Sequence, residues 1–256
     1  MKERVLPCNS PLIKLPFGGL RKEMLQLTAV AFMLCDHIWA TYMSFSNLLT
    51  YIGRLAFPIF AFLIAEGFCR TSDVKKYALR LLGFSIISEI PFNLFYSSRT
   101  FNPYHQNVML TLLLGLLAVM VIDRLKKDRS VKGILLSVLW LLLITVASVI
   151  GFVDYGLTGV LTVVMFYLFR DFPFAWVLQL IGMVLINIVF FEGQVIPVEL
   201  FGRAFELPTQ GFAVLSLIPV WLYGGKRFGK NRALQYGFYA FYPAHMLILY
   251  LIRYLA

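Results

Sequence analysis

Long apolar segments separated by short polar ones dominate the pattern along this chain. Nine of them, most about 17–22 residues long, can each cross about 30 Å of hydrocarbon as an α-helix. They cover residues 25–44, 51–69, 77–95, 108–122, 133–153, 155–169, 174–191, 209–223 and 238–254. The segments are continuous rather than alternating, which argues against outer-membrane barrel strands. The pattern therefore predicts an all-α, polytopic membrane bundle of about nine transmembrane helices.

The composition supports an integral membrane protein. Hydrophobic residues make up 60% of the 256 residues and charged residues only 14%, with a mean hydropathy of +0.79. A soluble domain of this length cannot bury so much apolar surface. The net charge of +10 does not indicate a nucleic-acid partner, because the cations lie in short segments between apolar runs. The three cysteines lack metal-binding spacing, so no metal site is predicted.

The cations are divided unequally between alternate loops. The N-terminal segment and the loops after even-numbered spans carry Lys2, Arg4, Lys14, Arg21, Lys22, Arg70, Lys75, Lys76, Arg124, Lys126, Lys127, Arg129, Lys132, Arg170, Lys226, Arg227, Lys230 and Arg232. The loops after odd-numbered spans carry only Arg99, Arg203 and Arg253. The positive-inside rule places the first set, and the N-terminus, in the cytoplasm. We expect a basic cytoplasmic segment over residues 1–24, a transmembrane domain over 25–256, and room for a short interfacial helix within the outer loop 192–210.

Ionisable side chains inside the apolar spans are the candidate functional residues, because burying them in a bilayer is costly. His37 lies about 18 Å from the cytoplasmic end of the first span, at 1.5 Å per residue. Glu89 is about equally deep in the third span, His245 is near mid-depth in the ninth, and Arg54 is in the outer third of the second. We expect these four side chains to converge on one buried site.

Asp36 precedes His37 directly, but adjacent residues on a helix point about 100° apart. Asp36 is therefore poorly placed to orient the ring of His37. Glu89 is the preferred carboxylate partner for His37, and Asp36 is expected to face Arg54.

Structural interpretations remain open for some of these polar residues. His245 is equally well explained as a hydrogen-bonding partner between helices. Glu66 and Arg80 both lie near the cytoplasmic end, where they can form a structural ion pair. The basic loops are better explained as topology determinants than as a phosphate site.

Four stretches in order along the chain resemble the TraX family, whose namesake is linked to N-terminal acetylation of conjugative pilin. They are residues 25–38 (LQLTAVAFMLCDHI), 52–62 (IGRLAFPIFAF, followed by Glu66-Gly67), 87–93 (ISEIPFN) and 241–245 (FYPAH). Residues 107–112 and 154–156 match more weakly. The resemblance covers most of the chain from Leu25 onward.

The TraX family looks like a shorter relative of the acyltransferase-3-like transmembrane acyltransferases. Those proteins use a membrane-embedded histidine. Those proteins carry a basic residue eleven positions before that histidine, on the same helix face and about 16 Å away. Here that position is Gln26, which supplies no charge. Lys22 is one turn lower on roughly the same face and is the alternative cation.

The resemblance implies a membrane acetyltransferase in the bacterial cytoplasmic membrane, taking acetyl groups from cytoplasmic acetyl-CoA. His37 would be the general base or a transient acyl carrier, supported by Asp36, Glu89 and Arg54. Arg54, Asn107 or Tyr242 would stabilise the oxyanion. The expected substrate-binding residues are Lys22, Gln26, Arg80, Asn107, Tyr242 and His245.

Two other function classes remain as alternatives. A small proton-coupled transporter or flippase would use Asp36, His37 and Glu89 as a proton relay. A non-catalytic membrane scaffold would need none of them charged. The ordered motifs favour the acetyltransferase, the missing internal repeat weighs against the transporter, and the clustered ionisable groups weigh against the scaffold. The acceptor is left open among a peptide terminus, an envelope glycan and a lipid-linked molecule.

Overall fold

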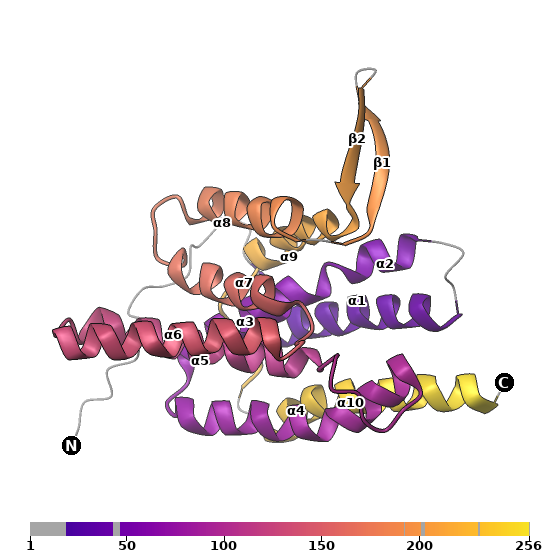
Figure 1. The fold of residues 1–256 in the computed structure, drawn as a ribbon, viewed down its shortest axis with the longest axis horizontal. Helices are drawn as coiled ribbons and strands as arrows, with labels where there is room; N and C mark the ends of the chain where they lie inside the picture. The colour runs from indigo at the N-terminus through magenta and orange to yellow at the C-terminus, as the bar shows by residue number, and fades with distance from the viewer. Residues whose placement is uncertain (1–18, 43–46, 192, 201–202, 230, 256) are drawn as a thin grey trace. The chain divides into compact units, whose positions relative to one another are not determined.

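The computed structural model describes residues 19–42, 47–191, 193–200, 203–229 and 231–255, and most of them are helical (Figure 1). The α-helices are α1 (Lys22–Tyr42), α2 (Leu48–Gly53), α3 (Ala56–Arg70), α4 (Val74–Ser97), α5 (Val108–Lys127), α6 (Val131–Ile150), α7 (Gly156–Leu168), α8 (Ala175–Val184), α9 (Leu217–Trp221) and α10 (Arg232–Leu255). A π-helix, η1 (Leu185–Val189), continues α8, and a 3-10 helix, η2 (Thr209–Ser216), precedes α9. The predicted helical class is confirmed. Most of the expected cytoplasmic segment 1–24 lies outside the described residues.

Five helical stretches are long and apolar enough to cross a membrane: Lys22–Tyr42, Leu48–Arg70, Val74–Ser97, Val108–Lys127 and Val131–Ile150. They coincide with the first five predicted spans. Shorter apolar helices over Gly156–Leu168, Ala175–Val189 and Thr209–Trp221 fall on the next three, and α10 falls on the ninth. Crossing by all nine, and the cytoplasmic N-terminus, stay predictions.

The chain forms two compact units, and its described part passes between them three times. Unit 1 contains residues 61–168 and 231–255 of the described chain, and unit 2 contains residues 19–60 and 169–229. The first passage lies inside α3, after Phe60, the second follows α7, and the third precedes α10. Each unit therefore combines segments that are distant in the sequence.

In unit 1, α5 packs against α4, α6 and α7, and α10 packs against α4. Gly115 of α5 allows the close approach of α7, because a Cβ there would lie 2.7 Å from Val163 Cγ2. Leu116 and Val163 are fully buried at this contact. In contrast, α6 leaves Leu135 and Leu139 more than half exposed. Such an apolar outer face suits lipid rather than water.

In unit 2, α1 packs against α2, and η2 contacts α2, α8 and η1. The start of α1 is joined to the segment after α9 by backbone hydrogen bonds. Leu20 N donates to Leu222 O at 3.0 Å, and Lys22 N donates to Lys226 O at 2.8 Å. The cation-bearing residues that precede α1 and follow α9 are therefore neighbours.

The outer loop forms a β-hairpin, so the interfacial helix expected within residues 192–210 is wrong. Strand β1 (Val195–Leu200) pairs antiparallel with β2 (Arg203–Pro208), from Val195 opposite Pro208 to Leu200 opposite Arg203. The residues of β1 explain the difference. Its valines and isoleucine are β-branched and favour a strand, and Pro197 cannot donate a helical hydrogen bond.

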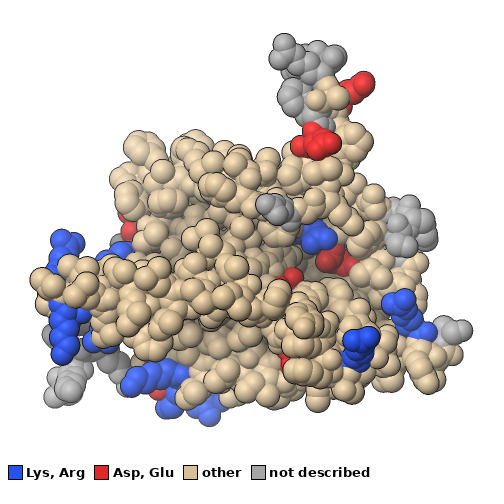
Figure 2. Space-filling model, viewed as in Figure 1, with Lys and Arg blue, Asp and Glu red and all other residues tan. Residues whose placement is uncertain are grey.

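In unit 1, Lys and Arg side chains gather at the end where α5 finishes and α6 begins (Figure 2). Arg124, Lys126 and Lys127 lie in the last turn of α5. Cations there also interact favourably with the negative end of the helix dipole. This end carries the α5–α6 loop that the charge distribution assigns to the cytoplasm.

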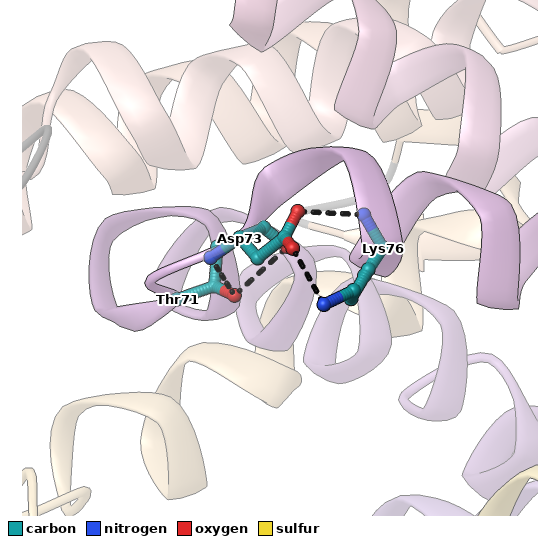
Figure 3. A network of polar contacts seen from close by, with 3 residues as sticks. All are labelled: Thr71, Asp73 and Lys76. Atoms are coloured by element: carbon teal, nitrogen blue, oxygen red, sulfur yellow. Dashed lines mark hydrogen bonds and ion pairs between the residues drawn. The ribbon is translucent and has the colours of Figure 1, made fainter.

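The turn between α3 and α4 is closed by a polar network (Figure 3). Asp73 caps α4: its carboxylate accepts a hydrogen bond from Lys76 N at 3.0 Å and lies 3.3 Å from Lys76 Nζ. Thr71 Oγ1 bonds the Asp73 backbone at 3.3 Å. The Lys76 backbone N–H lowers the pKa of Asp73 below its ordinary value of 3.8.

Replacing Asp73 by alanine is expected to lower the Tm in detergent near neutral pH, because α4 loses its N-cap. The lowered pKa means that the cap contributes stability above the ordinary carboxyl pKa, and this is lost as pH falls through the folded pKa. The Tm difference between wild type and Asp73→Ala should therefore shrink in acid. Asp73→Asn, which keeps an acceptor, is the control. A difference independent of pH would contradict this cap.

Candidate functional site

Three polar clusters of the described chain contain ionisable residues that the sequence had singled out. The Asp36 cluster in unit 2 comprises Asp36, Thr50 and Arg54. The Glu89 cluster in unit 1 comprises Glu89, Asn93 and Asn107. The Arg80 cluster, also in unit 1, comprises Tyr77, Arg80 and Tyr239.

The Asp36 cluster joins α1 to the end of α2. Thr50 Oγ1 donates to Asp36 Oδ1 at 2.7 Å, and Arg54 Nη2 donates to Thr50 Oγ1 at 3.2 Å. Arg54 Nη2 lies 3.9 Å from Asp36 Oδ1, and both side chains are about a fifth to a quarter exposed, at 24% and 20%. The threonine thus bridges an ion pair that is largely removed from solvent. Asp36 faces Arg54, as helix geometry led us to expect.

A break in the second span positions Arg54. Helix α2 ends at Gly53 and α3 begins at Ala56, so Arg54 lies between them. Pro58 explains the break, because a proline ring clashes with the carbonyl four residues earlier, here that of Arg54. Gly53 allows the contact with α1, since a Cβ there would lie 2.3 Å from Asp36 Cβ and 2.9 Å from Asp36 Cα.

Replacing Gly53 by alanine is expected to destabilise the protein by about 1–3 kcal/mol, the usual cost of overpacking a tight contact. The added methyl group must push α2 away from α1 and stretch the bond between Thr50 and Asp36. Thermal unfolding in detergent measures the effect. Gly83→Ala in α4 is the matched control, because nothing lies within 4 Å of its added Cβ. Equal Tm values for the two variants would contradict the close approach.

His37 lies on the buried stripe of α1. Its fractional exposure is 6%, and Leu25, Ala29 and Met33 precede it on the same stripe at four-residue intervals. Such spacing places side chains on one helix face. Gln26 and Lys22 are half-buried. His37 thus faces the protein and not lipid, as a reactive residue requires.

The Glu89 cluster holds both carboxylate oxygens of Glu89. Asn93 Nδ2 donates to Oε1 at 3.1 Å, and Asn107 Nδ2 donates to Oε2. Asn107 is the N-cap of α5, and its amide also donates to Ser85 O at 2.9 Å. Both amide hydrogens of Asn107 are therefore engaged. Asn107 thus positions Glu89, and its expected role as an oxyanion donor stays a prediction.

Tyr242 and His245 lie one turn apart on α10 and are both buried. His245 Nδ1 lies 2.8 Å from Phe241 O, and the two rings stack with centroids 4.8 Å apart. A donating Nδ1–H leaves Nε2 as the acceptor. The Tyr242 hydroxyl bonds the backbone N–H of Val108, and it interacts electrostatically with the carboxylates of Asp154 and Glu89. Tyr242 therefore adjoins the Glu89 cluster.

The Arg80 cluster places a cation between two tyrosines. The Arg80 guanidinium lies 5.3 Å from the Tyr77 ring centroid and 5.5 Å from that of Tyr239, and it hydrogen-bonds the Tyr239 hydroxyl. Glu66 instead pairs with Arg70, one turn later on α3. The ion pair between Glu66 and Arg80 considered from sequence is therefore wrong.

The structure brings some predicted residues together and leaves one pairing untested. Asp36 meets Arg54 in unit 2, and Glu89, Asn107 and Tyr242 meet in unit 1. His37 and Glu89 belong to different units, so their pairing stays a prediction. Sequence reasoning missed Thr50 and Asn93, although each lies four residues from Arg54 or Glu89 on the same helical face. It also gave no role to His105, which lies outside the predicted spans.

Each unit contains groups that are suited to group-transfer chemistry. Unit 2 contains a buried imidazole next to a bridged ion pair. Unit 1 contains a carboxylate fixed by two amides. A neutral imidazole can accept a proton, and the guanidinium can stabilise negative charge on oxygen.

Comparison with known proteins identifies the family of the chain. The chain is 26% identical over 242 residues to the "Probable fimbrial assembly protein FimC, serogroup H1" of Dichelobacter nodosus, a match that covers 88% of this chain and 92% of that protein. No solved structure matches the chain. The model of the TraX protein family matches residues 21–253, from just before α1 to the last turn of α10. The chain therefore belongs to the TraX family.

Proposed function

We propose that this protein is a membrane-embedded acetyltransferase that moves an acetyl group from acetyl-CoA to an acceptor outside the cytoplasm. The observation that carries the proposal is the burial of His37 directly after Asp36, which belongs to the Asp36 cluster. The match of the TraX family model to residues 21–253 supports the same function. An ionisable residue within a membrane span is costly and by default indicates a functional site. Proton transfer is a common chemical role of histidine.

The chemical step uses His37 as the proton acceptor. The acceptor amine or hydroxyl attacks the thioester carbonyl, a new bond forms to the acetyl carbon, and the carbon–sulfur bond breaks. The proton of the nucleophile passes to His37 and then to the CoA thiolate. In the second route, His37 itself carries the acetyl group between donor and acceptor. In both routes Arg54 stabilises the oxyanion, while Asp36 and Thr50 hold Arg54 in place.

The donor is proposed to bind at the cytoplasmic end of α1. Lys22 starts that helix, and its backbone is bonded to Lys226, while the Arg21 guanidinium lies 4.3 Å from the Phe228 ring centroid. These cations supply the positive charge that Gln26 lacks. They favour Lys22 as the group that binds a CoA phosphate, with Gln26 as a hydrogen-bonding residue. In unit 1, Arg80 is the cation that we propose to bind substrate.

The acceptor is proposed to be a fimbrial or pilus subunit. The fimbrial-assembly name of the Dichelobacter nodosus relative supports this choice. The N-terminal amine of a membrane-inserted subunit is a suitable nucleophile for acetyl transfer. The protein would act in the cytoplasmic membrane, where cytoplasmic acetyl-CoA and an emerging subunit are both accessible.

The test uses protein purified into lipid nanodiscs with acetyl-CoA labelled in the acetyl group. A peptide with a free N-terminal amine serves as acceptor, and the same peptide already acetylated serves as its control. We expect label on the free peptide alone. Failure to bind acetyl-CoA, together with proton-coupled flux in liposomes, would reject the acetyltransferase and support the transporter.

A further inference from the structure

A second histidine–aspartate pair occupies the loops at the end of unit 1 where α4 ends and α5 begins. His105 Nε2 lies 3.8 Å from Asp154 Oδ1, and their side chains are 38% and 31% exposed. Both residues lie in loops that the charge distribution places outside the cytoplasm. This separation is too long for a hydrogen bond between the two groups. An additional donor can therefore bond both atoms at once.

The backbone holds the two loops together. Gln106 N donates to Phe152 O at 2.9 Å, and Asp154 N donates to Gln106 O at 2.9 Å. Thr111 Oγ1, fully buried in α5, bonds the carbonyl of Asp154. The Asp154 carboxylate and the His105 side chain take no part in these bonds and are partly exposed.

The backbone around Asp154 is strained. Phe152 and Tyr155 have φ angles of 50° and 62°, in the left-handed region that bulky residues rarely adopt. Each such residue costs about 1–3 kcal/mol, and such strain persists chiefly where a site requires it. The strain thus indicates that the conformation of the Asp154 loop serves a function.

Aromatic rings hold His105 in place. The His105 ring lies 4.8 Å from Phe92 and 5.2 Å from Tyr96, centroid to centroid. A partly exposed carboxylate beside a fixed imidazole suits an organic ammonium, which can form a charge-assisted hydrogen bond to the carboxylate. A primary ammonium fits the spacing, because its nitrogen can lie about 2.9 Å from both Asp154 Oδ1 and His105 Nε2.

We propose that His105 and Asp154 form the acceptor site, which binds a primary ammonium and removes its proton. An α-amine with a pKa of about 7.7–8.0 is largely protonated at neutral pH and must lose a proton before it attacks. Asp154 binds the ammonium, and neutral His105 accepts one proton to give a free amine and an imidazolium paired with Asp154. The site is linked to the Glu89 cluster through Tyr242, whose hydroxyl interacts electrostatically with both Asp154 and Glu89. The catalytic use of this site rests on the proposed acetyltransferase, whereas its ammonium binding does not.

The first experiment measures binding without turnover. Wild-type protein is titrated with a peptide that has a free N-terminal amine and with the same peptide N-acetylated. We expect wild type to favour the free amine about tenfold, as one charge-assisted contact provides, and Asp154→Asn to lose this preference. Asp171→Asn, an exposed aspartate in unit 2, is the charge-matched control and should keep it. A preference that survives in Asp154→Asn overturns the proposal.

The second experiment separates this site from the proposed function. His105→Gln should lower kcat with the amine peptide, and the loss should shrink as the pH rises above the amine pKa of about 7.7–8.0. Tyr104→Phe, on the same exposed loop, should transfer normally. If wild type transfers no acetyl group, the proposed function fails, and the binding experiment still decides the ammonium site. If wild type transfers and His105→Gln matches it, the deprotonation role is overturned.

Discussion

Replacing His37 by alanine is expected to lower acetyl transfer by about 10²–10⁴-fold, the range that a positioned general base contributes. The residue is 6% exposed, and alanine removes the only imidazole of α1. His37→Asn keeps a polar side chain but cannot exchange a proton near neutral pH, so it should be equally inactive. Initial rates of labelled peptide formation in nanodiscs measure the loss.

The controls for His37 distinguish catalysis from folding. Leu27→Ala changes an exposed position of the same helix and should retain full activity. Glu89→Gln should be as inactive as His37→Ala if Glu89 sets the tautomer of His37. Full activity in Glu89→Gln would reject that pairing, and full activity in His37→Ala would reject the mechanism.

Replacing Asp36 by alanine is expected to destabilise the protein by about 3 kcal/mol, the lower end for breaking a buried ion pair. The variant leaves the Arg54 guanidinium in the membrane without its carboxylate and leaves Thr50 without its acceptor. Transfer should fall as well, because Arg54 is no longer held in place. Thermal unfolding and transfer rates are measured on the same preparation.

A double-mutant cycle tests whether the Asp36 cluster acts as one unit. Asp36→Ala and Arg54→Ala should each be costly, and the double variant should be less costly than their sum by about 1–3 kcal/mol. Ser72→Ala, an exposed change in the α3–α4 turn, should leave stability unchanged. Additive effects of Asp36→Ala and Arg54→Ala would mean that the ion pair contributes no coupling.

The helical architecture was largely predictable because apolar length and charge are local properties. Each of the first five predicted spans coincides with a long apolar helix, and Pro58 accounts for the break beside Arg54. The hairpin of the outer loop was missed, although Pro197 and its β-branched neighbours disfavour a helix there. The length of the loop does not distinguish a hairpin from a short helix, whereas the residues of β1 favour a strand.

Sequence alone predicted which ionisable residues lie at membrane depth, since that prediction follows from position within an apolar segment. It also identified the orientation of Asp36 toward Arg54, because helix geometry separates Asp36 from His37. Only the tertiary structure decided that Thr50 bridges that pair and that Asn107 is committed to Glu89, contacts that join residues 14 and 18 positions apart. It also assigned Glu66 to Arg70 and brought His105 to Asp154. Such partners depend on which helices and loops pack together, and no local pattern encodes that choice.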